Sequence, residues 1–263
     1  MKFFAQPAGQ DAHRKPTRTA VLLVNLGTPA APTAPAVRRY LREFLSDRRV
    51  VEIARALWLP ILYGLVLPFR SKQSAHKYAM VWTDQGSPLK FHTQQQALLL
   101  RGFLGDRGVD VDVRMAMRYG EPSVAQAMAA MREAGTERVL VLPMYPQYSG
   151  ATTASVYDAV CAQLMRTRDV PQLRWVRHFH DHPAYIEALK ASVLAHWKKY
   201  GQLRDRGAKL LISFHGVPRR TLDLGDPYHC ECHKTARLLR EALGLDDSDV
   251  IVAFQSRFGR ARW

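Results

Sequence analysis

Apolar runs of strand length alternate along this chain with segments in which apolar residues recur every three or four positions. The pattern predicts strands over 19–26, 109–117, 138–143, 173–178, 209–215 and 249–254. It predicts helices over 35–46, 71–82, 89–104, 122–134, 152–166, 183–200 and 232–243. Strands that alternate with helices in this way are typical of an α/β protein whose parallel sheets carry helices on both faces.

The pattern breaks near 168–172, a short polar stretch that contains Pro171. We therefore expect an N-terminal α/β domain over 19–170 and a C-terminal α/β domain over 171–263. Residues 1–18 carry several basic side chains but no apolar segment, and we expect them to form a disordered arm.

His215 ends an apolar run of strand length, and Gly216 and Pro218 prevent the strand from continuing. Ligands of open α/β sheets bind at the carboxyl ends of the strands, which is where this histidine falls. A histidine that merely caps its strand is the alternative. The other strand ends contribute Asn25–Pro29, Arg118–Gly120, Met144–Ser149, His178–His180 and Gln255–Phe258. Aromatic rings with hydroxyls and an arginine suit a flat apolar ligand with acidic arms.

The chain is strongly basic, with 38 Lys and Arg against 23 Asp and Glu and a formal net charge of +15. Such a balance favours an acidic small molecule, a polyanion or an anionic membrane surface as partner. The basic residues are scattered and no zinc-finger or RNA-binding motif accompanies them, so we expect no nucleic-acid partner. The first strand–helix turn has a single glycine, Gly27, where a dinucleotide fingerprint needs three. Nicotinamide and flavin enzymes are therefore excluded.

Three cysteines cannot build a disulfide framework, and no signal peptide is evident, so we expect a cytoplasmic setting. The most apolar stretch, 56–69, holds two prolines and is too short to span a bilayer. It is either core or a lip that contacts a membrane.

Two stretches are rich in histidine, and one of them, 229–233, resembles a metal cluster. The stretch 229–233, His-Cys-Glu-Cys-His, lacks the usual spacing of a zinc site, and a helix start with a buried cysteine is the favoured interpretation. His178, His180 and His182 alternate, so His178 could reach a cleft, while Asp181 is predicted to cap the helix that begins at Pro183. Structural roles are favoured for these histidines.

Seven short motifs occur in the order in which they are found in ferrochelatases. They are VNLGTP (24–29), QGSPL (85–89), MRY (117–119), YPQYS (145–149), SFHGVP (213–218), GDPY (225–228) and QSR (255–257). Together they span almost all of 19–263, and the chain most resembles the proteobacterial members of the family.

The resemblance implies two Rossmann-like, chelatase-type domains and a lyase that inserts Fe²⁺ into protoporphyrin IX at the last step of haem biosynthesis. It implies that His215 receives pyrrole protons or binds iron, and we rank the proton acceptor first. The porphyrin contacts that it implies are Leu26, Arg118, Tyr119, Ser149 and Trp263. It also makes 56–69 the lip of the porphyrin cleft, a candidate for peripheral membrane contact.

Members of this family continue past the position of Trp263 into a further strand, a glutamate-bearing loop and closing helices. We therefore expect the second domain to be incomplete, either as a fragment or as a truncated version. A catalytically inactive porphyrin- or haem-binding protein is the alternative, and a cobalt or nickel chelatase is disfavoured by the length of the chain. We expect no tightly bound cofactor, because three cysteines are too few for a Cys-ligated iron–sulfur cluster.

Overall fold

The computed structural model describes residues 3–4, 17–257 and 262–263, and the chain folds as two compact units. The first unit comprises Met1–Met144 and Gly150–Arg177, and the second comprises Tyr145–Ser149 and His178–Trp263. Of the arm expected over 1–18, residues 1–2 and 5–16 lie outside the described residues.

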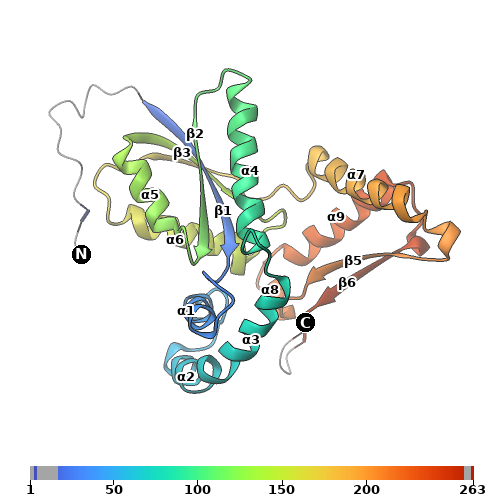
Figure 1. Ribbon diagram of the computed structural model, residues 1–263, viewed down its shortest axis with the longest axis horizontal. Coiled ribbons are helices and arrows are strands. Elements are labelled where there is room, and N and C mark those ends of the chain that lie inside the picture. The colour runs from blue at the N-terminus through green and yellow to red at the C-terminus, as the bar shows by residue number, and fades with distance from the viewer. Residues whose placement is uncertain (1–2, 5–16, 258–261) are drawn as a thin grey trace. The chain divides into compact units, whose positions relative to one another are not determined.

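A four-stranded parallel sheet forms the centre of the first unit (Figure 1). Its strands are β1 (Arg18–Gly27), β2 (Asp112–Tyr119), β3 (Thr136–Pro143) and β4 (Gln172–Trp175), in the order β2-β1-β3-β4. Within it, Val21 of β1 pairs with Val113 of β2 and with Leu140 of β3. The apolar run at 20–24 of β1 is buried, as expected for the central strand of a parallel sheet that is covered on both faces.

Helices cover both faces of this sheet, as the strand–helix alternation predicts (Figure 1). On one face α4 (Pro88–Gly105) packs through Ala97 onto a core that contains Val21, Leu23 and Val113. On the other face lie α5 (Val124–Glu133) and α6 (Ser155–Leu164), the latter preceded by the π-helical turn η2 (Gly150–Ala154).

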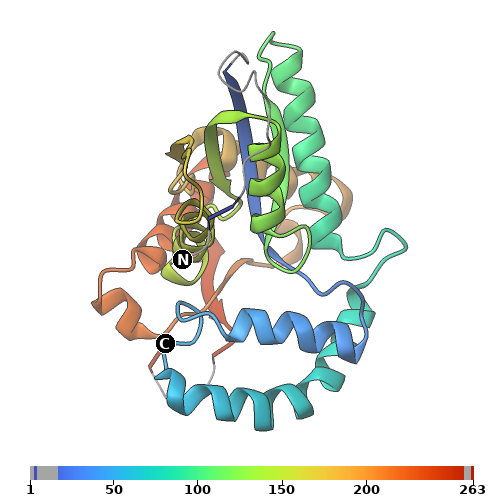
Figure 2. The same cartoon turned by 90° about the vertical axis from the view of Figure 1, so that its left-hand side faces the viewer.

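A second group of helices lies near the carboxyl ends of β1 and β2. Here α1 (Ala34–Leu45) packs beside α3 (Leu67–Val81). The π-helical turn η1 (Leu62–Val66) joins α2 (Arg55–Ile61) to α3, and Figure 2 shows these three segments as one continuous helical run. The turn falls between Pro60 and Pro68, neither of which can donate an N–H to the helix. None of the helices in the described residues is both long and apolar enough to cross a membrane.

The second unit contains a parallel pair of strands, β5 (Leu210–His215) and β6 (Val250–Gln255). Helix α9 (Tyr228–Ala242) packs on β6 and against α7 (Pro183–Tyr200) (Figure 1). Shorter helical segments complete the unit: η3 (Arg204–Arg206), α8 (Arg219–Asp223) and η4 (Asp247–Asp249).

Two local predictions about the loop before α7 are wrong. The strand predicted over 173–178 ends at Trp175, so His178 lies in a loop and not on a strand. The N-cap of α7 is His182 and not Asp181, because Pro183 occupies the first helical turn and the His182 side chain accepts the N–H of Ala184 at 3.2 Å. The carboxylate of Asp181 instead pairs with Lys234 at 2.6 Å.

Candidate functional site

His215 is the last residue of β5, opposite Gln255 of β6, and its side chain is exposed. The ring Nδ1 lies 2.7 Å from the carbonyl oxygen of Gly216. A carbonyl oxygen can only accept a hydrogen bond, so Nδ1 carries the proton and the lone pair of the neutral ring lies on Nε2. The imidazole is thus fixed in a tautomer whose Nε2 can accept a proton or bind a metal ion.

Trp263 lies beside the peptide that follows His215. A Cβ atom added to Gly216 would lie 3.1 Å from Cε3 of the Trp263 ring and 2.9 Å from the carbonyl oxygen of Gln255. Only a residue without a side chain leaves room there for both the indole and β6. The structure therefore brings together two of the residues predicted for the site, His215 and Trp263.

The GDPY motif leads into α9, whose first residue is Tyr228. One carboxylate oxygen of Asp226 accepts the N–H of Tyr228 at 3.0 Å, and the other accepts the hydroxyl of Ser149 at 3.2 Å. The Tyr228 hydroxyl is hydrogen-bonded to the backbone of His215, and burial raises the pKa of this phenol. Ser149 is itself buried. The motif therefore ties the predicted site residues Ser149 and His215 to one helix.

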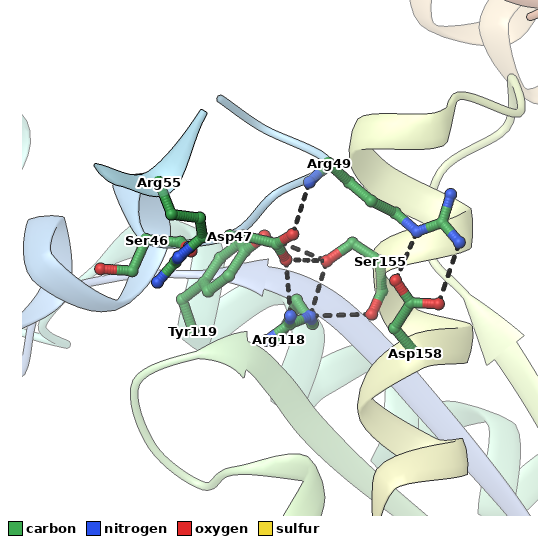
Figure 3. A network of polar contacts seen from close by, with 8 residues as sticks. All are labelled: Ser46, Asp47, Arg49, Arg55, Arg118, Tyr119, Ser155 and Asp158. Atoms are coloured by element: carbon green, nitrogen blue, oxygen red, sulfur yellow. Dashed lines mark hydrogen bonds and ion pairs between the residues drawn. The ribbon is translucent and has the colours of Figure 1, made fainter. Parts of the chain in front are cut away.

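In the first unit, Arg118 and Tyr119 end β2 and share a network of polar contacts with Asp47 and Ser155 (Figure 3). One oxygen of Asp47, Oδ2, accepts hydrogen bonds from Arg118 Nη2 at 2.6 Å, Tyr119 Oη at 2.8 Å and Ser155 Oγ at 2.6 Å. Arg118 Nε donates to both Ser155 oxygens, at 2.9 and 2.7 Å. The guanidinium carbon of Arg118 also lies 4.5 Å from the centre of the Tyr119 ring.

This network keeps a buried carboxylate ionised. Burial alone would raise the pKa of Asp47, but the hydrogen bonds from Ser155, Tyr119 and the Arg49 N–H, with the charge of Arg118, together lower it. Burial raises the pKa of Tyr119, so its hydroxyl stays protonated and remains a donor. Tyr119 is fully buried, and its effect on a ligand would act through Arg118.

Arg118 and Asp47 line a cavity of about 740 Å³ in the first unit. Its other walls come from α1, from the loop after β1 (residues 28–30) and from Tyr63 of η1. Leu26, half-buried at the end of β1, and Tyr119 are not among the lining residues. Glu43 is one of them; it accepts the Gly120 N–H at 2.9 Å, and burial raises its pKa. The size and the mixed polar and apolar lining suit a small-molecule ligand.

Replacing Asp47 with asparagine is expected to destabilise the chain by about 2–4 kcal/mol, because the guanidinium of Arg118, only 17% exposed, loses its counter-charge. The control is Asp158→Asn, which disrupts the ion pair with Arg49, whose side chains are 41% and 51% exposed, and costs under about 1 kcal/mol. Urea unfolding measures both.

The same network gives an expected pH dependence. The folded-state pKa of Asp47 is lowered, so its stabilisation is complete above the unfolded value of about 4 and is lost as the pH falls through the lower folded value. Asp47→Asn should flatten this acid limb of the stability curve. Equal unfolding midpoints for the two asparagine variants would contradict the role given to Asp47.

Sequence reasoning missed Asp47 and Ser155, which lie 71 and 37 residues from Arg118 and carry no motif of their own.

The stretch 229–233 does not fold into a metal site by itself. Cys232 is fully buried, and burial raises its pKa to about 12, so its thiol stays protonated. Glu231 of that stretch instead meets His178 and His180. No spacing rule links these two segments.

The model of the ferrochelatase family matches residues 18–263. The ferrochelatase of Methylibium petroleiphilum is 60% identical over 263 residues, which cover 100% of this chain and 71% of the relative. That of Janthinobacterium sp. is 59% identical over 251 residues, covering 95% and 67%. The Polaromonas sp. ferrochelatase is 58% identical over 267 residues, covering 100% and 71%. Among solved structures, SirB from Bacillus subtilis with Fe³⁺ aligns with a TM-score of 0.48 at 13% identity, over 93% of this chain and 68% of that one.

Proposed function

This chain belongs to the ferrochelatase family, the lyases that insert Fe²⁺ into protoporphyrin in haem biosynthesis, and we propose that His215 carries the proton transfer of this reaction. The observation that supports the proposal is the hydrogen bond between His215 Nδ1 and the Gly216 carbonyl, since it places the ring's lone pair on Nε2 at the carboxyl end of β5.

Metal insertion requires the loss of two protons from the porphyrin. A free porphyrin carries two pyrrole N–H groups in its plane, and their hydrogens shield the nitrogen lone pairs from the metal. A bent ring exposes these nitrogens and resembles the transition state of metal insertion. A protein that binds the ring in this shape uses its binding energy to lower the barrier to insertion. An imidazole can accept such a proton near neutral pH. His215 Nε2 takes this role in the proposal, with iron ligation as its second role.

The remaining site residues have different parts in the proposal. Arg118 is assigned the acidic arms of the ligand, because a guanidinium binds carboxylates well. Leu26 and Trp263 are assigned apolar contact with the ring. Tyr119 and Ser149 are buried and bonded to Asp47 and Asp226, so we assign them to positioning the groups around them. No tightly bound cofactor is part of the proposal, and Fe²⁺ enters as substrate.

The test is the fluorescence of protoporphyrin IX mixed anaerobically with the purified chain and Fe²⁺, or with Zn²⁺ as a substitute metal. We expect the emission of the free porphyrin to decay catalytically, with many turnovers per chain. Porphyrin binding without any metal insertion would contradict the proposal.

We also propose that the enzyme works in the cytoplasm with its apolar segment 56–69 against a membrane. Leu57, Leu65 and Phe69 are 65%, 58% and 73% exposed, whereas Leu62 and Leu67 of the same segment are buried. The segment thus has one face that packs on the protein and another that presents apolar side chains outward. Apolar side chains on a chain of net charge +15 favour an anionic lipid surface.

The double variant Leu57→Ser/Phe69→Ser is expected to bind anionic phospholipid vesicles at least about tenfold more weakly, since each inserted side chain contributes about 1 kcal/mol or more. Co-sedimentation measures the partitioning. The matched control is Leu99→Ser/Phe103→Ser, whose targets on α4 are each 59% exposed. Equal losses of vesicle binding in both double variants would contradict a specific membrane contact through 56–69.

A further inference from the structure

Two histidines and a glutamate converge inside the second unit. His178 and His180 lie on the loop before α7, which is held by the hydrogen bond from the Phe179 N–H to the Pro146 carbonyl at 2.9 Å. Glu231 projects from the first turn of α9 and is buried. None of the three belongs to the site proposed for the porphyrin reaction.

The three side chains present their ligand atoms to one another. His178 Nδ1 lies 2.7 Å from Glu231 Oε1, and His180 Nδ1 lies 3.3 Å from Glu231 Oε2. One ligand atom from each residue can be chosen so that all lie within 4.8 Å of one another. A metal ion bound at about 2.1 Å from each needs ligand atoms roughly 3.3 Å apart, which shifts of ~1 Å would provide.

One of these atoms is buried without a hydrogen bond. The His180 side chain is 4% exposed, and its Nδ1 has no hydrogen-bond partner among the described residues. The nearby Oε2 of Glu231 instead accepts the N–H of Tyr148 at 2.7 Å. A buried polar atom left in this state costs free energy, so the atom points to a ligand that would complete its bonding.

The charges around Glu231 point the same way. Its carboxylate is only 9% exposed, and the nearest lysine on its helix, Lys234, is held by Asp181 at 2.6 Å. A buried carboxylate that lies beside two imidazoles is stabilised by a cation placed among them.

We propose that His178, His180 and Glu231 bind a divalent first-row transition metal ion of the Fe²⁺ or Zn²⁺ class. Two imidazoles and one carboxylate are the ligand set that such ions take when they keep open positions for water or another ligand. His178 is 37% exposed, which gives solvent access to the ion and room for those positions.

Further hydrogen bonds support the ligand residues from behind. The Thr235 hydroxyl contacts the backbone carbonyls of His180 at 2.9 Å and Glu231 at 3.1 Å, and Gln147 donates to the same hydroxyl at 2.9 Å. These hydrogen bonds hold the backbone of two ligand residues, so the ligand positions are set by the fold around them.

The test uses Co²⁺ as a spectroscopic probe on the full chain after treatment with a chelator. It is done in a His215→Ala background, so that any ion bound at that residue does not contribute. We expect a single Co²⁺ to bind and to give the visible d–d absorption of a site with nitrogen and oxygen ligands. Adding His178→Gln or Glu231→Gln should weaken this binding at least tenfold.

The matched control is His196→Gln, which removes an exposed histidine of α7 and should leave Co²⁺ affinity unchanged. Thermal unfolding without metal shows whether each variant folds, and the exposed position of His178 makes its variant the more tolerant of the two. Zn²⁺ should raise the unfolding temperature of the parent but not of the two ligand variants. Absence of Co²⁺ binding to the parent, or equal affinity in all variants, would overturn the proposal.

Discussion

Replacing His215 with alanine is expected to slow metal insertion at least about a hundredfold while porphyrin affinity stays within about threefold. The factor follows from the range of about 10²–10⁴ that a positioned general base contributes. His215 is exposed at the end of β5, and its ring bonds to the neighbouring Gly216 carbonyl, so the truncation leaves no cavity in a core. Porphyrin fluorescence measures the insertion rate, and its quenching on titration with protein measures the affinity.

Added bases separate the two roles proposed for His215. If the residue accepts protons, both imidazole and a hindered base that cannot bind metal, such as 2,6-lutidine, should partly restore the rate of His215→Ala. If it ligates iron, imidazole alone should do so. His196→Ala, at an exposed helical histidine of the same unit, serves as control and should keep the parent rate. A parent rate in His215→Ala would remove the residue from the mechanism.

The sequence was sufficient wherever local chemistry decides the structure. Helix α7 has the bounds predicted for it, 183–200, because Pro183 starts it and Gly201 follows its end. Strand β1 was predictable because its residues 20–24 form a continuous apolar run, as the centre of a parallel sheet requires. His215 stood out because Gly216 and Pro218 end its strand. In each case the cause lies within a few residues of its effect.

The sequence was insufficient where the partners are far apart. Asp47 precedes Arg118 by 71 residues, and His178 precedes Glu231 by 53, so neither pairing leaves a spacing pattern. The 173–178 strand was predicted too long because an apolar pattern does not show where a neighbouring strand stops pairing, and β4 pairs with β3 only as far as Trp175. The 56–69 segment was ambiguous because one of its faces is buried and the other exposed.

The second large effect is expected for Gly27, the last residue of β1. Its φ angle is +114°, and an added Cβ would lie 1.8 Å from the backbone carbonyl oxygen of Tyr119, its partner on β2. Both the backbone conformation and the contact exclude a side chain, so Gly27→Ala must push β1 and β2 apart. We expect a loss of about 3 kcal/mol or more of unfolding free energy, since strain at such a position is among the few causes of large effects.

Helix α4 offers the matched control, because Gly102 is exposed there and an added Cβ would meet nothing within 4 Å. Gly102→Ala should stabilise the chain by about 0.5–1 kcal/mol through helix propensity. Urea unfolding of the two alanine variants should thus give shifts of opposite sign. The contact falls on Tyr119, and Arg118, the neighbouring residue on β2, is a proposed porphyrin contact. Gly27→Ala should therefore also weaken porphyrin binding in the fraction of the protein that stays folded. An unfolding midpoint in urea equal to that of the parent would contradict the close approach of β1 and β2 at Gly27.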